Sequence, residues 1–402
     1  MTNNRMTFPL CAVLVSAAIC VLPASAFCGR KIVLSEHLGL TWRDEVVSYP
    51  FAAEKEECTA GSVMLVGPKG PQACQLSDVV LWDGSKFVKS ARISFVVARL
   101  APQTSQTYTV SIGKPKAKTG LAISIKNGRM EATVARFGVK LLVGEKSYEP
   151  AAAPAKVPGP LLGMRLADGK WFGGSVMFGS TPIKAYVASV VDSGPIFVRV
   201  RCLYTYADGN TLEVITRLNA GGRGVIFETN SAKNKPSDGW DLQLTPGLPE
   251  LTLQFPREAA GKQGDATRIG KTNWMQRPLS AYAAGTITKL SPWGDWWNEY
   301  TQPDIYLQFD DGKREFSLVR RESGRWVKPV KSGGARFGYF ESKTVPLIKQ
   351  ADGTIALHVN NASGVRVWSL SQGDDSQKKF AMYPALKGPA SGPPLELDAV
   401  KD

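Results

Sequence analysis

Histidine is nearly absent from this chain of 402 residues, in which the only two are His37 and His358. They lie far apart in the sequence, and no Cys-x-x-Cys motif accompanies them. Zinc sites are built from closely spaced cysteine and histidine ligands, so the sequence argues against zinc. Each histidine falls in or beside an expected strand, and we expect structural roles for both.

Long apolar segments are missing after the N-terminus, so no membrane-spanning helix is expected. The first 26 residues are different: Arg5 precedes an apolar run over residues 8–22, and Ala24-Ser25-Ala26 follows it. This is the pattern of a secretory signal peptide with its cleavage site. We therefore predict cleavage near Ala26 and a secreted or periplasmic mature protein.

Helical periodicity is also absent from the mature chain. Short β-branched and aromatic runs occur instead, for example over residues 31–34, 107–112, 196–206, 211–218 and 355–359. Many such runs flank Asn-Gly or Asp-Gly pairs, which are strong hairpin signals. We predict an all-β protein, with a small N-terminal barrel followed by a large antiparallel β-sandwich.

A Pro/Ala-rich stretch over residues 149–160 lacks periodicity, which is typical of a linker. We place a domain boundary there, with the signal at 1–26, the barrel at 27–150 and the sandwich at 151–402. Residues 230–285 have scattered Gly, Pro and polar residues and predict a second, loop-rich region.

The formal net charge is +14, which favours acidic partners or simply a well-solvated surface. Four cysteines remain after the predicted cleavage, and an oxidising compartment would permit disulfides. Cys58 and Cys74 are the candidate pair because they lie close together in one domain, although four cysteines allow three pairings.

The N-terminal half, through residues 38–50, 67–79, 90–97 and 106–110, resembles the barrel of the exo-rhamnogalacturonan lyase-like (YetA-like) proteins. Residues 192–200 and the following hairpin resemble the start of that family's central sandwich. The resemblance implies a RIFT-type barrel, a sandwich and β-elimination on an acidic, pectin-type polysaccharide. The family's helical toroid has no counterpart in the sequence, so the chain is either an N-terminal part of a longer product or a branch without that domain.

A cluster of aromatic and polar residues over 291–301 is the main candidate for sugar binding. It contains Trp293, Asp295, Trp296, Trp297 and Glu299. Aromatic faces stack on pyranose rings while carboxylates bind sugar hydroxyls, although the same residues could pack a sandwich edge. Upstream Trp240 and Trp274, in the loop-rich region, could line the same cleft.

A polysaccharide lyase needs a base and a group that neutralises the uronate. Tyr300 and Arg320 are the candidates for these roles, with an exposed basic hairpin as the structural alternative. No metal ligand set is apparent, and no Asp-rich loop indicates Ca²⁺, which stays an open possibility.

Paired carboxylates such as Asp295 and Glu299 would instead suggest a glycoside hydrolase. The chain has no Gly-x-Ser-x-Gly nucleophile motif, no phosphate-binding loop and no nucleic-acid-binding module. The leading hypothesis is a secreted lyase, or part of one, acting on acidic polysaccharide. The alternatives are a non-catalytic glycan-binding or structural module and, third, a glycoside hydrolase.

Overall fold

The computed structural model describes residues 29–36, 41–115, 118–166, 168–221, 224–231, 235–244, 252–257, 273–278, 285–286, 306–310, 315–320, 347–361 and 364–372. Within these residues the chain is almost entirely antiparallel β-strand, with two short 3-10 helices and no α-helix. The all-β, sandwich-type prediction is confirmed.

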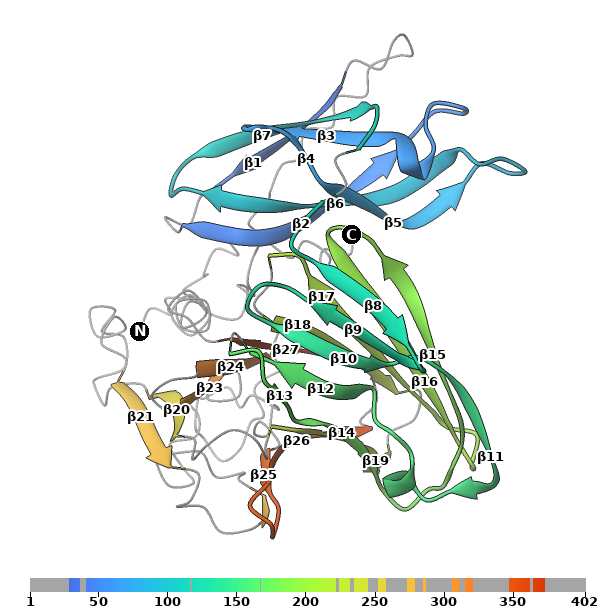
Figure 1. Ribbon diagram of the computed structural model, residues 1–402, viewed down its shortest axis with the longest axis vertical. Coiled ribbons are helices and arrows are strands. Elements are labelled where there is room, and N and C mark those ends of the chain that lie inside the picture. Colours follow the sequence, from blue (N-terminus) through green and yellow to red (C-terminus); the bar gives the residue numbers. More distant parts are fainter. Residues whose placement is uncertain are drawn as a thin grey trace, which may run out of the picture.

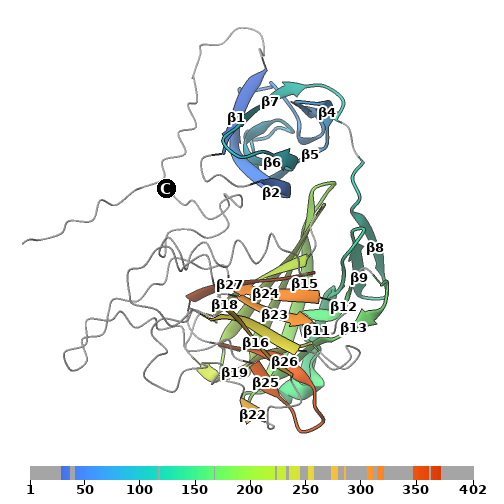
Figure 2. The same ribbon diagram turned by 90° about the vertical axis from the view of Figure 1, so that its left-hand side faces the viewer.

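The N-terminal unit consists of two curved sheets that enclose one core (Figures 1 and 2). The first sheet contains, in spatial order, β1 (Arg30–Ser35), β7 (Ser105–Ile112), β3 (Val63–Gly67) and β4 (Gly70–Gln72). The second contains β2 (Trp42–Ala52), β6 (Val88–Leu100) and β5 (Cys74–Leu81), and the 3-10 helix η1 (Ala60–Ser62) leads into β3. Phe95 and Val47 are fully buried at the centre of this core. The unit is all-β, as the sequence predicts for the N-terminal barrel, and its strands form two antiparallel sheets around the core.

The second unit is a large sandwich. One layer is a ten-stranded sheet of β11 (Gly144–Ala152), β15 (Ile183–Ser193), β16 (Phe197–Tyr206), β17 (Thr211–Asn219), β18 (Gly224–Ser231), β27 (Gly364–Gln372), β24 (Glu315–Arg320), β23 (Tyr306–Asp310), β20 (Thr252–Arg257) and β21 (Asn273–Pro278).

Two five-stranded sheets complete the sandwich. The first, called here the small sheet, runs β13 (Trp171–Phe172), β12 (Leu161–Arg165), β10 (Gly138–Leu142), β9 (Arg129–Thr133) and β8 (Ala122–Lys126). The second runs β14 (Gly174–Phe178), β19 (Lys235–Gln243), β26 (Ile355–Asn361), β25 (Leu347–Lys349) and β22 (Gly285–Thr286). A single hydrophobic core joins residues from all three sheets.

Local turn chemistry explains the hairpins. Asn127 and Gly128 join β8 to β9 with φ of 52° and 70°, the pair of positive values that a type I′ turn requires. Between β16 and β17, Gly209 has φ 80° and the Asp208 carboxylate accepts a hydrogen bond from the Asn210 N–H at 2.9 Å. Both turns lie where the sequence predicts them.

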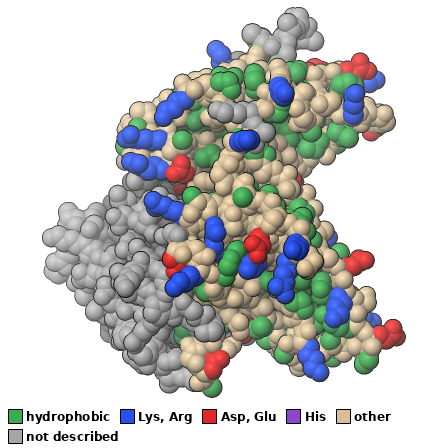
Figure 3. Space-filling view, in the orientation of Figure 1, with side chains coloured by type: hydrophobic (Ala, Val, Ile, Leu, Met, Phe, Trp, Pro, Cys, Tyr) green, Lys and Arg blue, Asp and Glu red, His purple; other side chains and the backbone are tan. Residues whose placement is uncertain are grey.

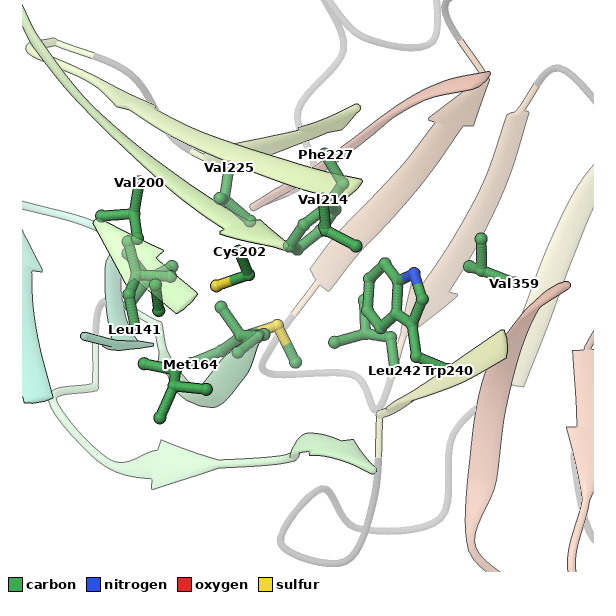
Figure 4. Close-up of a cluster of buried hydrophobic side chains, with 14 of the residues drawn as sticks. Leu141, Met164, Val200, Cys202, Val214, Val225, Phe227, Trp240, Leu242 and Val359 are labelled. Carbon is green, nitrogen blue, oxygen red and sulfur yellow. The ribbon is translucent and has the colours of Figure 1, made fainter. Parts of the chain in front are cut away.

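Strand alternation builds the sandwich core. Along β16, Val198, Val200 and Cys202 point inward and are almost fully buried, while Arg199 and Arg201 between them are more accessible. Figure 4 shows Val200 and Cys202 from this layer near Leu141 and Met164 of the small sheet. A period of two in the sequence therefore places one face of each strand in the core.

The Pro/Ala-rich stretch is not a linker in the structure. It forms the end of β11 and the 3-10 helix η2 (Pro154–Lys156), and the adjoining Val157 is 2% exposed within the sandwich core. The change from the barrel core to the sandwich core falls earlier, between Val110 on β7 and Met130 on β9. Strands β8 to β11 thus pack with the sandwich, although the sequence assigns them to the barrel.

The region expected to be rich in loops contains a central strand. Trp240 on β19 is fully buried and packs edge-to-face on Phe227, with ring centroids 5.6 Å apart. It is a core residue and does not line a sugar-binding cleft. Asp238 on the same strand is also fully buried, and its carboxylate accepts hydrogen bonds from the N–H groups of Ser180 and Thr181 and from the Thr181 hydroxyl. These bonds hold the β14–β15 connection against β19.

Candidate functional site

The outer face of the small sheet carries an aromatic ring among charged groups, and we call it the Trp171 face. Trp171 lies on the short edge strand β13, in register with Arg165 on β12. Lys140 on β10 is in register with Glu131 on β9. These side chains come from four strands, so only the folded sheet brings them together.

The geometry of the Trp171 face is defined by contacts with the ring. The Lys140 ammonium nitrogen lies 4.2 Å from the ring centroid, and the Arg165 guanidinium carbon lies 5.8 Å from it. Lys140 also pairs with the Glu131 carboxylate at 3.3 Å. The strand positions beneath these groups include Gly138 and Gly163. The face therefore combines one aromatic ring, hydrogen-bond donors and an acceptor.

Basic side chains are spread over both units on the face seen in Figure 3, rather than gathered in one strip. The accessible half of the Glu131 side chain keeps a carboxylate among the cations of the Trp171 face. The Trp171 face therefore presents both hydrogen-bond donors and acceptors. Both kinds of group are needed to bind the hydroxyls of a neutral sugar.

A second charged group lies at the junction of barrel and sandwich. Arg199 on β16 donates through Nη2 to Asp78 on β5 at 2.8 Å, and through Nε to Asp192 on β15. Burial alone would lower the pKa of Arg199, but hydrogen bonds and charge from the two carboxylates outweigh it, and the pKa is raised. The guanidinium is thus a permanent cation shared by two carboxylates.

The aromatic cluster predicted as a sugar site lies outside the described residues, namely Trp293, Asp295, Trp296, Trp297, Glu299 and Tyr300. Arg320 is the last residue of β24 and Trp274 the second of β21. Strands β23 and β20 lie between β24 and β21 in the ten-stranded sheet. The side chains of Arg320 and Trp274 are outside the described part.

His37 also lies outside the described residues. His358 is on β26, as the sequence predicts, in register with Asp241 on β19. Among the described residues, no group of three or more His, Cys, Asp or Glu side chains is arranged to hold a metal ion.

Cys58 and Cys74 are both buried in the barrel core, but each carries a free thiol, so the predicted bridge is not formed in the structure. The Cys74 thiol instead donates to the Val63 carbonyl, with a sulfur–oxygen distance of 3.6 Å. Cys202 is a third buried free thiol, in the sandwich core. Cys58 and Cys74 thus share one core, but they are not joined by a disulfide, which requires a specific geometry of the two residues.

Burial raises the pKa of Cys74 to about 11 and that of Cys202 to about 12, from an ordinary 9.0. Above pH 9 the unfolded chain loses these protons while the folded protein keeps them, so the folded state is progressively disfavoured. We expect the melting temperature to fall as the pH rises from 9 to 11. Cys202→Ala should flatten this fall in thermal melts, and an unchanged slope would contradict the assignment.

No direct signal for the Trp171 face is present in the sequence. Trp171 follows the Asp168-Gly169 turn motif, and a tryptophan on a short strand after a turn is the only local hint. Glu131, Lys140 and Arg165 are separated along the chain by other strands, so their meeting depends on sheet register.

In the part of the chain that the structure describes, no helix has the length and apolar character needed to span a bilayer. The sequence matches no protein-family model and no curated protein.

Solved structures with a similar fold do exist. An α-mannosidase from Enterococcus faecalis V583 aligns with a TM-score of 0.51 at 12% identity, covering 89% of this chain and 44% of that one. A glycosyl hydrolase family 38 protein from Enterococcus faecalis aligns with a TM-score of 0.50 at 12% identity, covering 89% and 46%. This chain thus spans less than half the length of either. At this identity the likeness establishes the fold alone.

These neighbours correct the functional hypothesis. One neighbour is named as an α-mannosidase and the other as a glycosyl hydrolase family 38 protein, and neither is a rhamnogalacturonan lyase. The resemblance to the lyase family and the pectin-degrading lyase activity that it implied are therefore wrong. The alternative of a non-catalytic glycan-binding or structural module fits no better. An acidic polysaccharide partner is likewise not supported. The turns and strand order behind the resemblance recur among β folds, and they did not identify a family.

Proposed function

We propose that this protein is of the glycoside hydrolase type and acts on α-mannosides. The observation that carries the proposal is the fold likeness over 89% of the chain to the α-mannosidase from Enterococcus faecalis V583. A shared fold supports a functional hypothesis but does not establish it, so support is also needed from the residues of the site. The paired carboxylates Asp295 and Glu299 stay the sequence-based candidates for acid and base, outside the described residues.

The Trp171 face supports this proposal through its chemistry. A mannoside is neutral, so its binding draws on hydroxyl hydrogen bonds and on contact between its C–H face and an aromatic ring. Arg165 and Lys140 can donate to sugar hydroxyls, and the Glu131 carboxylate can accept. Because Lys140 already lies over the ring and pairs with Glu131, a sugar reaching Trp171 would displace the ammonium toward that carboxylate.

The predicted signal over residues 1–26 complements the proposal, because a glycoside-degrading protein meets polymeric substrates outside the cytoplasm. We propose that the chain is exported and that the signal is removed near Ala26. N-terminal sequencing of the protein from its native host would test this, and an intact Met1 terminus on the mature protein would contradict it.

The direct test is incubation of the purified protein with an aryl α-mannoside and with α-linked mannooligosaccharides. Time-dependent release of mannose that disappears on boiling is the expected result. No release from any of these α-mannosides by folded protein would overturn the proposal, and matched β-mannosides and acidic polysaccharides serve as controls for specificity.

Trp171→Ala is expected to raise the Kd for an α-mannooligosaccharide about tenfold, which corresponds to about 1.4 kcal/mol. The loss reflects removal of the aromatic surface on which the sugar packs. Isothermal titration calorimetry measures it. Trp82→Ala is the matched control, because Trp82 in the barrel has a similar partner, with the Lys89 ammonium 5.2 Å from its ring centroid. Equal effects of the two substitutions, or no effect of either, would remove the Trp171 face from the proposal.

A further inference from the structure

The turn between β15 and β16 meets the barrel through one buried side chain. The Gln75 side-chain oxygen on β5 accepts hydrogen bonds from the backbone N–H groups of Ile196 at 3.0 Å and Phe197 at 2.9 Å. Gln75 is 7% exposed, so this contact is shielded from water. One barrel side chain thus satisfies two adjacent backbone donors of the sandwich.

Apolar side chains surround this contact. Val46 and Ala73 from the barrel form a small separate cluster with Ile196 and Phe197 from the sandwich, and all four are buried. The exclusion of water strengthens hydrogen bonds within such a cluster. The contact between the units is therefore dry at its centre.

The backbone approaches too closely here for a side chain on the turn. A Cβ atom on Gly194 would lie 2.5 Å from the Gln75 side-chain carbonyl carbon and oxygen. A side chain at residue 194 would therefore displace the Gln75 carboxamide from its place beside the turn. The segment that joins the two units is fastened to the same turn, since the Thr119 hydroxyl donates to the Pro195 carbonyl.

Charged groups form the rim of the junction. Arg199 of the sandwich links Asp78 of the barrel to Asp192, and its guanidinium carbon lies 5.7 Å from the Phe197 ring centroid. The Arg217 guanidinium carbon lies 4.2 Å from the centroid of the same ring. The Asp78 side chain is 50% accessible, so the ion pair with Arg199 is exposed to solvent. The Gln75 contact is buried.

We infer that Gln75 and the turn over residues 194–197 clamp the barrel and the sandwich into one rigid body in solution. Domains joined by small polar contacts ordinarily move relative to one another. Here a buried two-donor hydrogen bond, an apolar cluster and a glycine-dependent close approach act at the same point. The clamp is independent of the proposed activity on mannosides, and it would hold for any function of the two units.

Energy transfer between two bioorthogonal dyes tests the clamp in the full chain. Val33 on β1 and Val187 on β15 are suitable label positions, because they are 55% and 46% exposed and lie on opposite units. We expect a single narrow distance distribution for the parent protein. Gln75→Ala should broaden it about twofold, as expected for domains released to move.

Gly194→Ala tests the same contact from the sandwich side and provides a second variant if Gln75→Ala folds poorly. Gln103→Ala, at an exposed glutamine of the same barrel, is the control and should leave the width unchanged. A distribution that is already broad in the parent protein would overturn the clamp. So would a narrow distribution in folded Gln75→Ala and Gly194→Ala proteins.

Discussion

Trp240→Ala is expected to lower the free energy of unfolding by about 3–5 kcal/mol, the range found when a large aromatic side chain is removed from a packed core. Trp240 is fully buried between the layers of the sandwich and packs on Phe227 (Figure 4). Alanine would leave a cavity that the rigid sheets on either side cannot close. Urea denaturation followed by circular dichroism measures the loss.

Trp240→Phe separates packing from hydrogen bonding at this site. The indole N–H of Trp240 has no hydrogen-bond partner among the described residues, so phenylalanine loses volume and no hydrogen bond. We expect a cost well below that of alanine, about 1–2 kcal/mol from the smaller void. Equal losses for the two variants would show that the indole nitrogen contributes through a bond, contrary to the structure.

Gln75→Leu is expected to lower the free energy of unfolding by about 2–4 kcal/mol, because two buried backbone donors lose their acceptor. Leucine has a similar size but cannot accept from the N–H groups of Ile196 and Phe197. The change in the denaturation midpoint provides the measurement. Gln103→Leu, at an exposed position, is the control and should stay within about 0.5 kcal/mol of the parent protein.

Salt and a conservative variant sharpen this prediction. The Gln75 contact is neutral and buried, so its effect should persist at high salt, whereas the exposed Asp78–Arg199 pair should be screened. Gln75→Glu keeps an acceptor oxygen and should retain more stability than Gln75→Leu. A Gln75→Leu cost that vanishes in 1 M salt would contradict a buried neutral clamp.

Hairpins were the part of the fold that local sequence specified best. The Asn127-Gly128 and Asp208-Gly209 turns and the strands beside them occur as predicted, because positive φ and a period of two are properties of a few neighbouring residues. Strand β26 around His358 was predicted on the same basis. Such signals do not depend on what the strands pack against.

Strand β19 shows where local signals fail. Its sequence, KPSDGWDLQ, contains proline, glycine and two aspartates, which are poor strand formers. It is a strand because β14 and β26 pair with it on either side and because Trp240 fills the core. Likewise, the Pro/Ala-rich segment that suggested a linker is held in the sandwich by burial of Pro154 and Val157.

The candidate site was less predictable than the fold. The Trp171 face joins residues from β9, β10, β12 and β13, and the clamp joins Gln75 to a turn more than a hundred residues away. Neither arrangement leaves a motif of fixed spacing. The function inferred from turns and strand order was wrong for the same reason, since those features describe β-structure in general and carry no site chemistry.

The all-β, antiparallel character of the protein could be read from the sequence alone, because it follows from alternation along the strands and from the residues in the turns. The boundary between the two cores, the unpaired state of the buried thiols and the meeting of polar groups across strands follow from tertiary packing. Those outcomes depend on register and on packing between distant segments, where each residue's environment is set by neighbours that the linear order does not reveal.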